Sequence, residues 1–274
     1  MRALDQVGAV SRCRNGGPLS GLWAARWLLL QWVRRDFTVQ YRQSALGALW
    51  AVGQPLSLLL VYGLVFRNVL GVRPPQGSYL VFALCGLVPW TFVASAVNRS
   101  VTSLANASPI IKQVYFPRAV VPLAATGVTM IDLAAGTSVL LVVQVLANGQ
   151  LHLASLSLAL IYLDLVLVLG AVSVVASLLG ALVRDVRFLI PLLLQIGFIA
   201  TPVMYPRSLV PVRFGWLYDL NPVGRVIEAV RAAVIEGRWP APALLGALTV
   251  VGIVLLGLAI WYSAAIEERL PDLL

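Results

Sequence analysis

Residues 239–266 read WPAPALLGALTVVGIVLLGLAIWYSAAI, a run of 28 residues that contains no charged side chain. A helix needs about 20 predominantly apolar residues to cross the hydrocarbon core of a bilayer. Five further charge-free runs of comparable length precede this one, at 43–66, 74–98, 133–163, 165–183 and 188–206. The chain is therefore expected to form an all-α bundle of membrane helices rather than to carry a single anchor.

Composition also separates this chain from soluble proteins. Of its 274 residues, 60% are apolar and 11% are charged, whereas an ordinary soluble domain carries about 25% charged residues. The net charge of +9 could suggest nucleic acid as a partner. The basic residues lie between the apolar runs, however, where positive charge orients a membrane protein, and they form no single basic stripe. We therefore expect the chain to contact a lipid bilayer and no nucleic acid.

The apolar runs and the polar or proline- and glycine-containing breaks between them predict six crossings of the membrane. We place these crossings at about 44–67, 79–103, 119–147, 154–183, 188–205 and 241–263. They form a single transmembrane domain over 44–265, with a polar tail (1–19) and an interface helix (20–43) before it and a cytosolic tail (266–274) after it.

Residues 20–43 predict a helix of a different kind. Its apolar residues recur at spacings of three and four, which places them on one face. They are Trp23, Trp27, Leu30, Val33, Phe37 and Tyr41. An amphipathic helix of this kind suits a position in the membrane interface. The alternative is a soluble helix on the cytosolic end of the bundle.

The distribution of positive charge predicts the orientation. Thirteen basic residues fall on the side that holds both termini, and seven fall on the other side. The side with more Lys and Arg usually faces the cytoplasm. We therefore expect both termini to be cytoplasmic and the 206–240 segment to lie on the outer side.

The 206–240 segment mixes arginines, acidic residues and prolines with plainly apolar residues. This mixture suits short re-entrant helices, which are tolerated at membrane depth where protein or a water-filled cavity surrounds them. Val223, Ile227, Val230 and Val234 recur at helical spacing and predict a buried helix face. We expect Arg207–Glu236 to close the outer end of a transport path, where its arginines could meet anionic groups of a substrate or of lipid headgroups. The residues expected at this outer gate are Pro202, Pro206, Asn221, Pro222 and Arg225.

No catalytic, cofactor or metal site is predicted. A phosphate-binding loop needs a glycine-rich turn that ends in Lys-Ser or Lys-Thr, but the only lysine, Lys112, stands between Ile111 and Gln113. One His and two Cys do not make a metal cluster. If transport uses ATP, a separate chain must bind ATP and Mg and hydrolyse the ATP. We expect that this chain itself is not an enzyme.

Two carboxylates lie inside the apolar runs, at Asp132 and Asp164. Buried carboxylates are costly in a membrane, so they usually face the interior of a bundle or an aqueous path. A contact with substrate or with a proton is one interpretation. A hydrogen bond from a hydroxyl or amide of a neighbouring helix is the other.

Five segments carry a resemblance to a known family. They are 35–44 (RDFTVQYRQS) with Leu46-Gly47 and Trp50, 110–118 (IIKQVYFPR), 184–187 (RDVR) with Pro191 and Gln195, 201–206 (TPVMYP) and 220–222 (LNP). In this order, over about residues 30–265, the chain resembles the membrane subunits of ATP-binding-cassette polysaccharide exporters, which serve O-antigen, capsule and teichoic acid.

The resemblance implies a homodimer in the inner, cytoplasmic membrane with two copies of a separate ATP-binding-cassette ATPase docked below it. The substrate would be a lipid-linked polysaccharide. The cytosolic loop 105–118 would dock into the ATPase and couple hydrolysis to export, because it is short and bounded by prolines, with the interface helix supporting it. The coupling residues would be Lys112, Gln113, Tyr115, Phe116, Pro117, Arg118, Arg35 and Asp36.

The resemblance also implies a path between the two permease chains, lined mainly by the first and fifth crossings. Aromatic rings suit such a path, because sugar rings present C–H faces to them. The candidates are Trp50, Tyr62, Phe66, Phe198 and Tyr205, with Asp132 from the third crossing. Tyr62 and Phe66 share a face of the first crossing, and Phe198 and Tyr205 share a face of the fifth. Lipid contact or packing between helices is the alternative role for these aromatics.

Two other functions remain as alternatives. A membrane-embedded enzyme of glycan or lipid assembly would show a cluster of acidic or His residues at a water-facing edge, and no such cluster is visible in the sequence. A secondary transporter would usually show internal repeats with paired broken helices, and the two halves of the chain show no convincing repeat.

Overall fold

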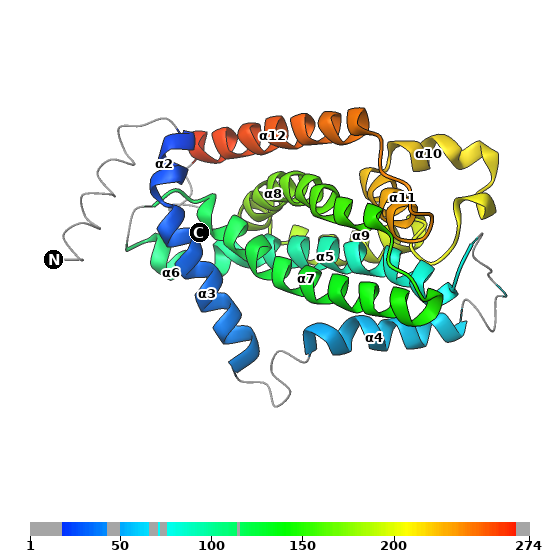
Figure 1. The fold of residues 1–274 in the computed structure, drawn as a ribbon. Coiled ribbons are helices and arrows are strands. Elements are labelled where there is room, and N and C mark those ends of the chain that lie inside the picture. Colours follow the sequence, from blue (N-terminus) through cyan, green and yellow to red (C-terminus); the bar gives the residue numbers. More distant parts are fainter. Residues whose placement is uncertain (1–17, 43–49, 66–70, 72–75, 114–115, 267–274) are drawn as a thin grey trace.

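The computed structural model describes residues 18–42, 50–65, 71, 76–113 and 116–266 (Figure 1). Within these ranges the chain is helical and contains no strand. The α-helices are α2 (Pro18–Ala24), α3 (Arg26–Arg42), α4 (Trp50–Gly63), α5 (Tyr79–Asn106), α6 (Ser108–Ile111), α7 (Val120–Asn148), α8 (Leu158–Leu182), α9 (Val186–Ala200), α10 (Gly215–Leu220), α11 (Pro222–Val234) and α12 (Pro242–Ala265). The 3-10 helices are η3 (Leu153–Ser157), η4 (Arg207–Leu209) and η5 (Val212–Phe214).

Four of these helices are long and apolar enough to cross a membrane, and α9 is a shorter apolar helix. The four are α5, α7, α8 with η3 before it, and α12. They agree within a few residues with the second, third, fourth and sixth predicted crossings, and the all-α prediction is confirmed for the described residues. The structure differs at the fifth predicted crossing, because α9 ends at Ala200 and not at 205. The start of the first, at 44–49, lies outside the described residues.

The helix α5 forms the centre of the bundle. The helices α4, α7, α8, α9 and α11 all pack against it, and most of its side chains are buried. Figure 1 shows α5 and α7 running through the middle of the molecule, with α12 along one side and α4 along the opposite side.

Two glycines allow backbone segments to approach at the centre of the bundle. The carbonyl of Val203 lies against Gly86 of α5, and the carbonyl of Val101 in α5 lies against Gly180 of α8. A methyl group at either glycine would overlap the facing carbonyl oxygen. Small residues let membrane helices come close enough to gain van der Waals contact. Space alone therefore requires glycine at both positions.

The helix α12 is held against α8 by small residues and by one polar pair. The hydroxyl of Thr249 in α12 donates a hydrogen bond of 2.5 Å to the carboxylate of Asp164 in α8, and Asp164 is buried. Gly252 and Gly170 lie where leucine side chains of the partner helix approach. This bond agrees with one of the two interpretations of Asp164, a hydrogen bond from a hydroxyl of a neighbouring helix. Within the described part of the chain, the other carboxylate oxygen, Oδ2, is buried without a hydrogen-bond partner.

The interface helix predicted over 20–43 consists of two helices, α2 and α3, with a turn residue at Ala25 between them. Backbone hydrogen bonds continue across this residue, so the interruption is slight. Figure 1 shows α3 lying across one end of the bundle, and it packs on α7. Trp32 and Ala25 are buried, whereas Trp23 and Trp27 are 71% and 72% exposed.

The face that α3 presents to the bundle matches the predicted apolar face only in part, since Val33 and Phe37 of that face are partly buried. The predicted face leaves Trp23, Trp27 and Leu30 exposed, and exposed tryptophans suit the lipid headgroup region better than water. The helix packs through Trp32 and the partly buried Val33, whose side chain lies against Gly127 of α7.

A methyl group at position 180 is expected to loosen the bundle. Gly180→Ala places a Cβ against the carbonyl of Val101, and overpacking of this kind costs about 1–3 kcal/mol. Gly257→Ala in α12 is the matched control, since a Cβ there meets no atom within 4 Å. Thermal unfolding of the purified chain in detergent should show a lower midpoint for Gly180→Ala than for Gly257→Ala. Equal midpoints would mean that α5 and α8 can separate without cost.

Removing the hydroxyl at position 249 is expected to destabilise the pair of α8 and α12. Thr249→Val leaves a buried carboxylate oxygen without its donor, at a cost of about 1–3 kcal/mol. Replacing both partners, as in Asp164→Leu with Thr249→Val, should recover most of this loss, because no polar group is then left unpaired. The same unfolding measurement compares the variants. A double variant no more stable than Thr249→Val would contradict a structural role for the pair.

Candidate functional site

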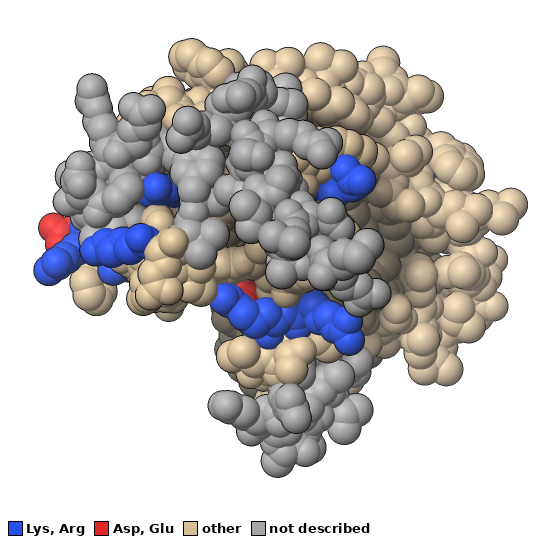
Figure 2. All heavy atoms as spheres, turned by 90° about the vertical axis from the view of Figure 1, so that its left-hand side faces the viewer, with Lys and Arg blue, Asp and Glu red and all other residues tan. Residues whose placement is uncertain are grey.

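The two ends of the bundle carry different charge. One end is formed by α2, α3, α6 and the turn between α8 and α9, and we call it the basic end. Among the described residues at this end, the acidic ones are Asp36 and Asp185, and the basic ones are Arg26, Arg34, Arg35, Arg42, Arg99, Lys112, Arg118, Arg184 and Arg187. Figure 2 looks onto this end and shows groups of Lys and Arg with few Asp or Glu. The segment 206–240 at the opposite end carries five Arg and three acidic residues.

At the basic end, an aromatic contact joins α3 to the segment that follows α6. The ring of Trp32 lies 5.8 Å from that of Phe116, centroid to centroid. The guanidinium of Arg35 lies 4.0 Å from the centre of the Trp32 ring, and it is paired at 2.9 Å with Asp36. Three of the predicted coupling residues are therefore brought together, through a tryptophan that the sequence did not single out.

The remaining predicted coupling residues divide into anchored and exposed positions. Phe116 and Arg118 are buried and Pro117 is partly buried, whereas Lys112 and Gln113 are exposed. Tyr115 lies outside the described residues. The segment after α5 is thus held to the bundle at one end and presents two polar side chains outward next to it, which suits contact with another protein.

A cavity of about 230 Å³ lies beneath α3 at the basic end. Trp32, Arg35 and Asp36 of α3 line it together with residues near the end of α5 and the start of α7, among them Arg99 and Asn106. Any movement of α3 relative to α5 and α7 would change the shape of this cavity.

At the opposite end, residues 201–204 form a buried, non-helical stretch directly after α9. Arg231 donates a hydrogen bond of 2.7 Å to the carbonyl of Val203, and Tyr79 of α5 donates one of 3.2 Å to the carbonyl of Met204. The side chain of Asn221 donates one of 2.9 Å to the hydroxyl of Thr201. Side chains from α5 and from α11 with its capping residue therefore supply partners for this stretch of chain.

The helix α11 is built as the sequence predicted. The side-chain oxygen of Asn221 accepts hydrogen bonds from the backbone N–H groups of Val223 and Gly224, which caps the helix. Pro222 occupies the first helical position, where a missing N–H costs nothing. The predicted apolar face is confirmed, since Ile227, Val230 and Val234 are buried and Val223 packs against the same core. Pro202 and Pro206 are buried, and Arg225 is exposed.

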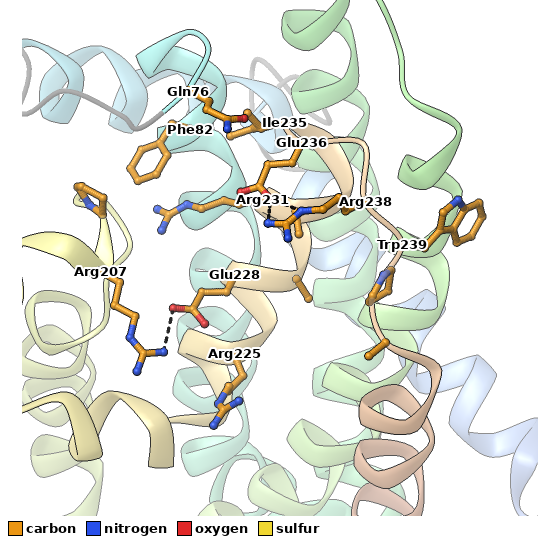
Figure 3. Close-up of a pocket in the computed structure, with 15 residues that line it drawn as sticks. Gln76, Phe82, Arg207, Arg225, Glu228, Arg231, Ile235, Glu236, Arg238 and Trp239 are labelled. Carbon is orange, nitrogen blue, oxygen red and sulfur yellow. Dashed lines mark hydrogen bonds and ion pairs between the residues drawn. The ribbon is translucent and has the colours of Figure 1, made fainter.

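A pocket of about 480 Å³ opens between α11, η4 and the link from α11 to α12. Figure 3 shows its charged lining, with Arg207, Glu228 and Arg225 close together and with Arg231 and the pair of Glu236 and Arg238 next to them. Phe82 and Trp239 contribute aromatic walls. Of the outer-gate residues predicted from sequence, Arg225 and Pro206 line this pocket. Arg231 also lines it and was not among the predicted residues, because only the fold reveals its burial.

The residues expected along a transport path are not gathered in one place. Tyr62 of α4 and Phe198 of α9 are in contact, with ring centroids 5.1 Å apart, and Phe198 also contacts Trp90 of α5 at 5.9 Å. Packing between helices therefore accounts for this pair within one chain. Trp50 is exposed at the first described residue of α4.

Three further path candidates need separate comment. Asp132 is partly buried on α7, and Phe66 lies outside the described residues. The shared helix face proposed for Phe198 and Tyr205 is wrong, because α9 ends at Ala200. Tyr205 lies in the chain beyond it, where its hydroxyl donates to the carbonyl of Ile199 at 2.8 Å and lies 2.5 Å from the hydroxyl of Tyr218. In the sequence, only Pro202, two residues later, indicates this early end.

Comparisons of the sequence with known proteins identify a family and several similar proteins. A family model described as ABC-2 type transporter matches residues 28–235. The chain is 31% identical over 214 residues to the O-antigen export system permease protein RfbA of Klebsiella pneumoniae, covering 77% of this chain and 81% of that protein. It is 28% identical over 251 residues to the protein of the same name from Myxococcus xanthus, covering 90% and 94%. It is 27% identical over 206 residues to the polysialic acid transport protein KpsM of Escherichia coli, covering 74% and 79%.

Proposed function

This chain belongs to the ABC-2 type transporter family, and from that premise we propose that it is the permease subunit of an ATP-driven exporter of a lipid-linked polysaccharide in the cytoplasmic membrane. The observation that carries the proposal is its similarity, along most of its length, to proteins named for O-antigen export and for polysialic acid transport. The polysaccharide is the common class among those names, so it is the substrate class proposed for this chain.

A separate ATPase completes the exporter. The sequence has no phosphate-binding loop around Lys112, so ATP and Mg would bind in two copies of a partner chain, with the permease acting as a homodimer. The anchored segment with exposed Lys112 and Gln113 at the basic end is the proposed docking site. Because the ring of Phe116 packs against that of Trp32, a force applied to this segment would reach α3 directly.

In the proposed topology α4 and α9 are the first and fifth of six crossings, and the basic end is cytoplasmic. The 15 residues of α9 span only about 22 Å at 1.5 Å per residue, less than the roughly 30 Å of a hydrocarbon core. The stretch 201–206 and the following short helices would complete the outer side. None of the side chains of α9 is buried, and Phe188 is 80% exposed, which fits contact with lipid or with a second copy of the chain.

The proposed transport path runs between the two copies, along α4 and α9. Tyr62 and Phe198 contact each other, so they can line a path only if part of each ring stays accessible. Both side chains are partly exposed, which supports this role. The segment from Arg207 to Glu236 would close the outer end of the path.

Charge reversal at position 112 is expected to uncouple ATP hydrolysis from export. Lys112→Glu places a negative charge at the proposed docking site, and unfavourable charge contacts at an interface cost enough to lower coupling about tenfold or more. Lys112→Arg, which keeps the charge, is the control. ATP hydrolysis and polysaccharide export are measured in vesicles that contain the permease and its ATPase. Normal export from Lys112→Glu, and from a deletion of Tyr115–Phe116, would refute the docking site.

Labelling of introduced cysteines tests the topology. In a variant without Cys13 and Cys85, Gln150→Cys should react with a membrane-impermeant reagent added from outside, and Lys112→Cys should react only after the cells are opened. The reason is that position 112 lies shortly before the first residue of α7, whereas position 150 lies just after its last residue. Labelling of position 112 from outside would reverse the proposed orientation.

The outer segment can be tested without damage to the core. The helix α11 buries Ile227, Val230 and Val234, so it must stay, but residues 207–220 can be replaced by a Gly/Ser linker of equal length. We expect the complex to assemble, as judged by size-exclusion chromatography, while export falls or the membrane becomes leaky to small solutes. Normal export without leakage would mean that this part is only a connection and that the gate lies elsewhere.

A further inference from the structure

We propose that the 480 Å³ pocket beside α11 binds the phosphate group of a lipid. The inference rests on the proposed function only in placing this end of the bundle at the outer membrane surface. The phosphate could belong to a phospholipid of the bilayer or to the exported lipid-linked glycan, since both present a phosphate next to an apolar chain.

The charges of the pocket lining favour an anion. Four arginines and two glutamates line it, which leaves an excess of two positive charges. Each glutamate already has an arginine beside it, since Arg207 lies 3.7 Å from Glu228 and Arg238 is paired with Glu236. A phosphate can therefore be attracted to this pocket without displacing a carboxylate. The planar guanidinium group suits phosphate because it can donate two parallel hydrogen bonds.

Arg231 adds a buried cation to the wall of the pocket. Arg231 is 8% exposed, and its guanidinium lies 3.7 Å from the centre of the Phe82 ring. One of its terminal nitrogens donates to Val203, but within the described part of the chain its Nε, also buried, has no hydrogen-bond partner. Burial lowers the pKa of Arg231 to about 10, which still leaves it charged at neutral pH.

The apolar side of the pocket favours a lipid over free phosphate. Trp239 lines the pocket and is 61% exposed, and tryptophan is enriched where a membrane meets water. Pro240 and Ala241 follow it in the lining and lead directly into α12, one of the long apolar helices. A lipid whose phosphate lay among the arginines could therefore place its chain along the surface of α12, most of which is exposed.

Binding of three probes to the full-length chain in a neutral detergent tests the proposal. The probes are short-chain phosphatidylglycerol, inorganic phosphate, and a short synthetic glycolipid with a phosphate between sugar and chain. We expect Arg225→Gln with Arg238→Gln to weaken the affinity for phosphatidylglycerol about tenfold or more, since each charge-assisted hydrogen bond contributes about 1.5–3 kcal/mol. Arg213→Gln is the matched control, because it removes an arginine from the same segment outside the pocket lining. This control should change the affinity less than about twofold.

Each result decides one part of the proposal. Equal loss in the pocket variant and in the Arg213→Gln control would overturn the site, and inorganic phosphate binding as tightly as the lipid would overturn its assignment to lipid. Tighter binding of the glycolipid than of phosphatidylglycerol supports the exported substrate as the source, and equal binding supports the bilayer. Arg231→Lys keeps the positive charge at position 231. Its unfolding midpoint is measured together with its affinity for the lipid, so that a loss of binding can be told apart from a loss of folding. Binding is read without ATPase or export, so a failure of the proposed function would not be confused with a failure of this site.

Discussion

The arrangement of the bundle depends on the burial of α5. Helices in a membrane gain little from the hydrophobic effect when they associate, so contact has to come from close packing. Around α5 this packing reaches backbone level at Gly86 and Gly180, where carbonyl groups lie against the glycines. Neighbouring helices cover α5 along most of its length, which restricts its movement relative to them.

This central helix joins the two ends that carry the candidate sites. Its first residue, Tyr79, donates a hydrogen bond to Met204 in the stretch after α9. Near its other end, Arg99 and Asn106 line the cavity beneath α3. The two ends are therefore tied to one rigid element, and a displacement of α5 relative to its neighbours would alter both.

The stretch 201–204 illustrates what an irregular backbone needs in a membrane protein. Backbone groups that do not pair within a helix must find partners inside the protein. Here Tyr79 of α5 and Arg231 of α11 donate hydrogen bonds to the backbone carbonyls of Met204 and Val203, and Asn221 donates one to the side-chain hydroxyl of Thr201. Arg231 can be buried because it donates a hydrogen bond to the carbonyl of Val203. The same position places it next to the pocket.

The sequence by itself determined the class of the protein, the places of the long helices and the short helix α11. Long charge-free runs favour membrane-spanning helices, and the spacing of Ile227, Val230 and Val234 predicts a buried helix face. Only the tertiary structure decided which face of α3 meets the bundle and where α9 ends. It also decided that Trp32 contacts Phe116, and that Arg231 is buried against Phe82. These features depend on which residues from distant parts of the chain come together, and local periodicity carries no information about such partners.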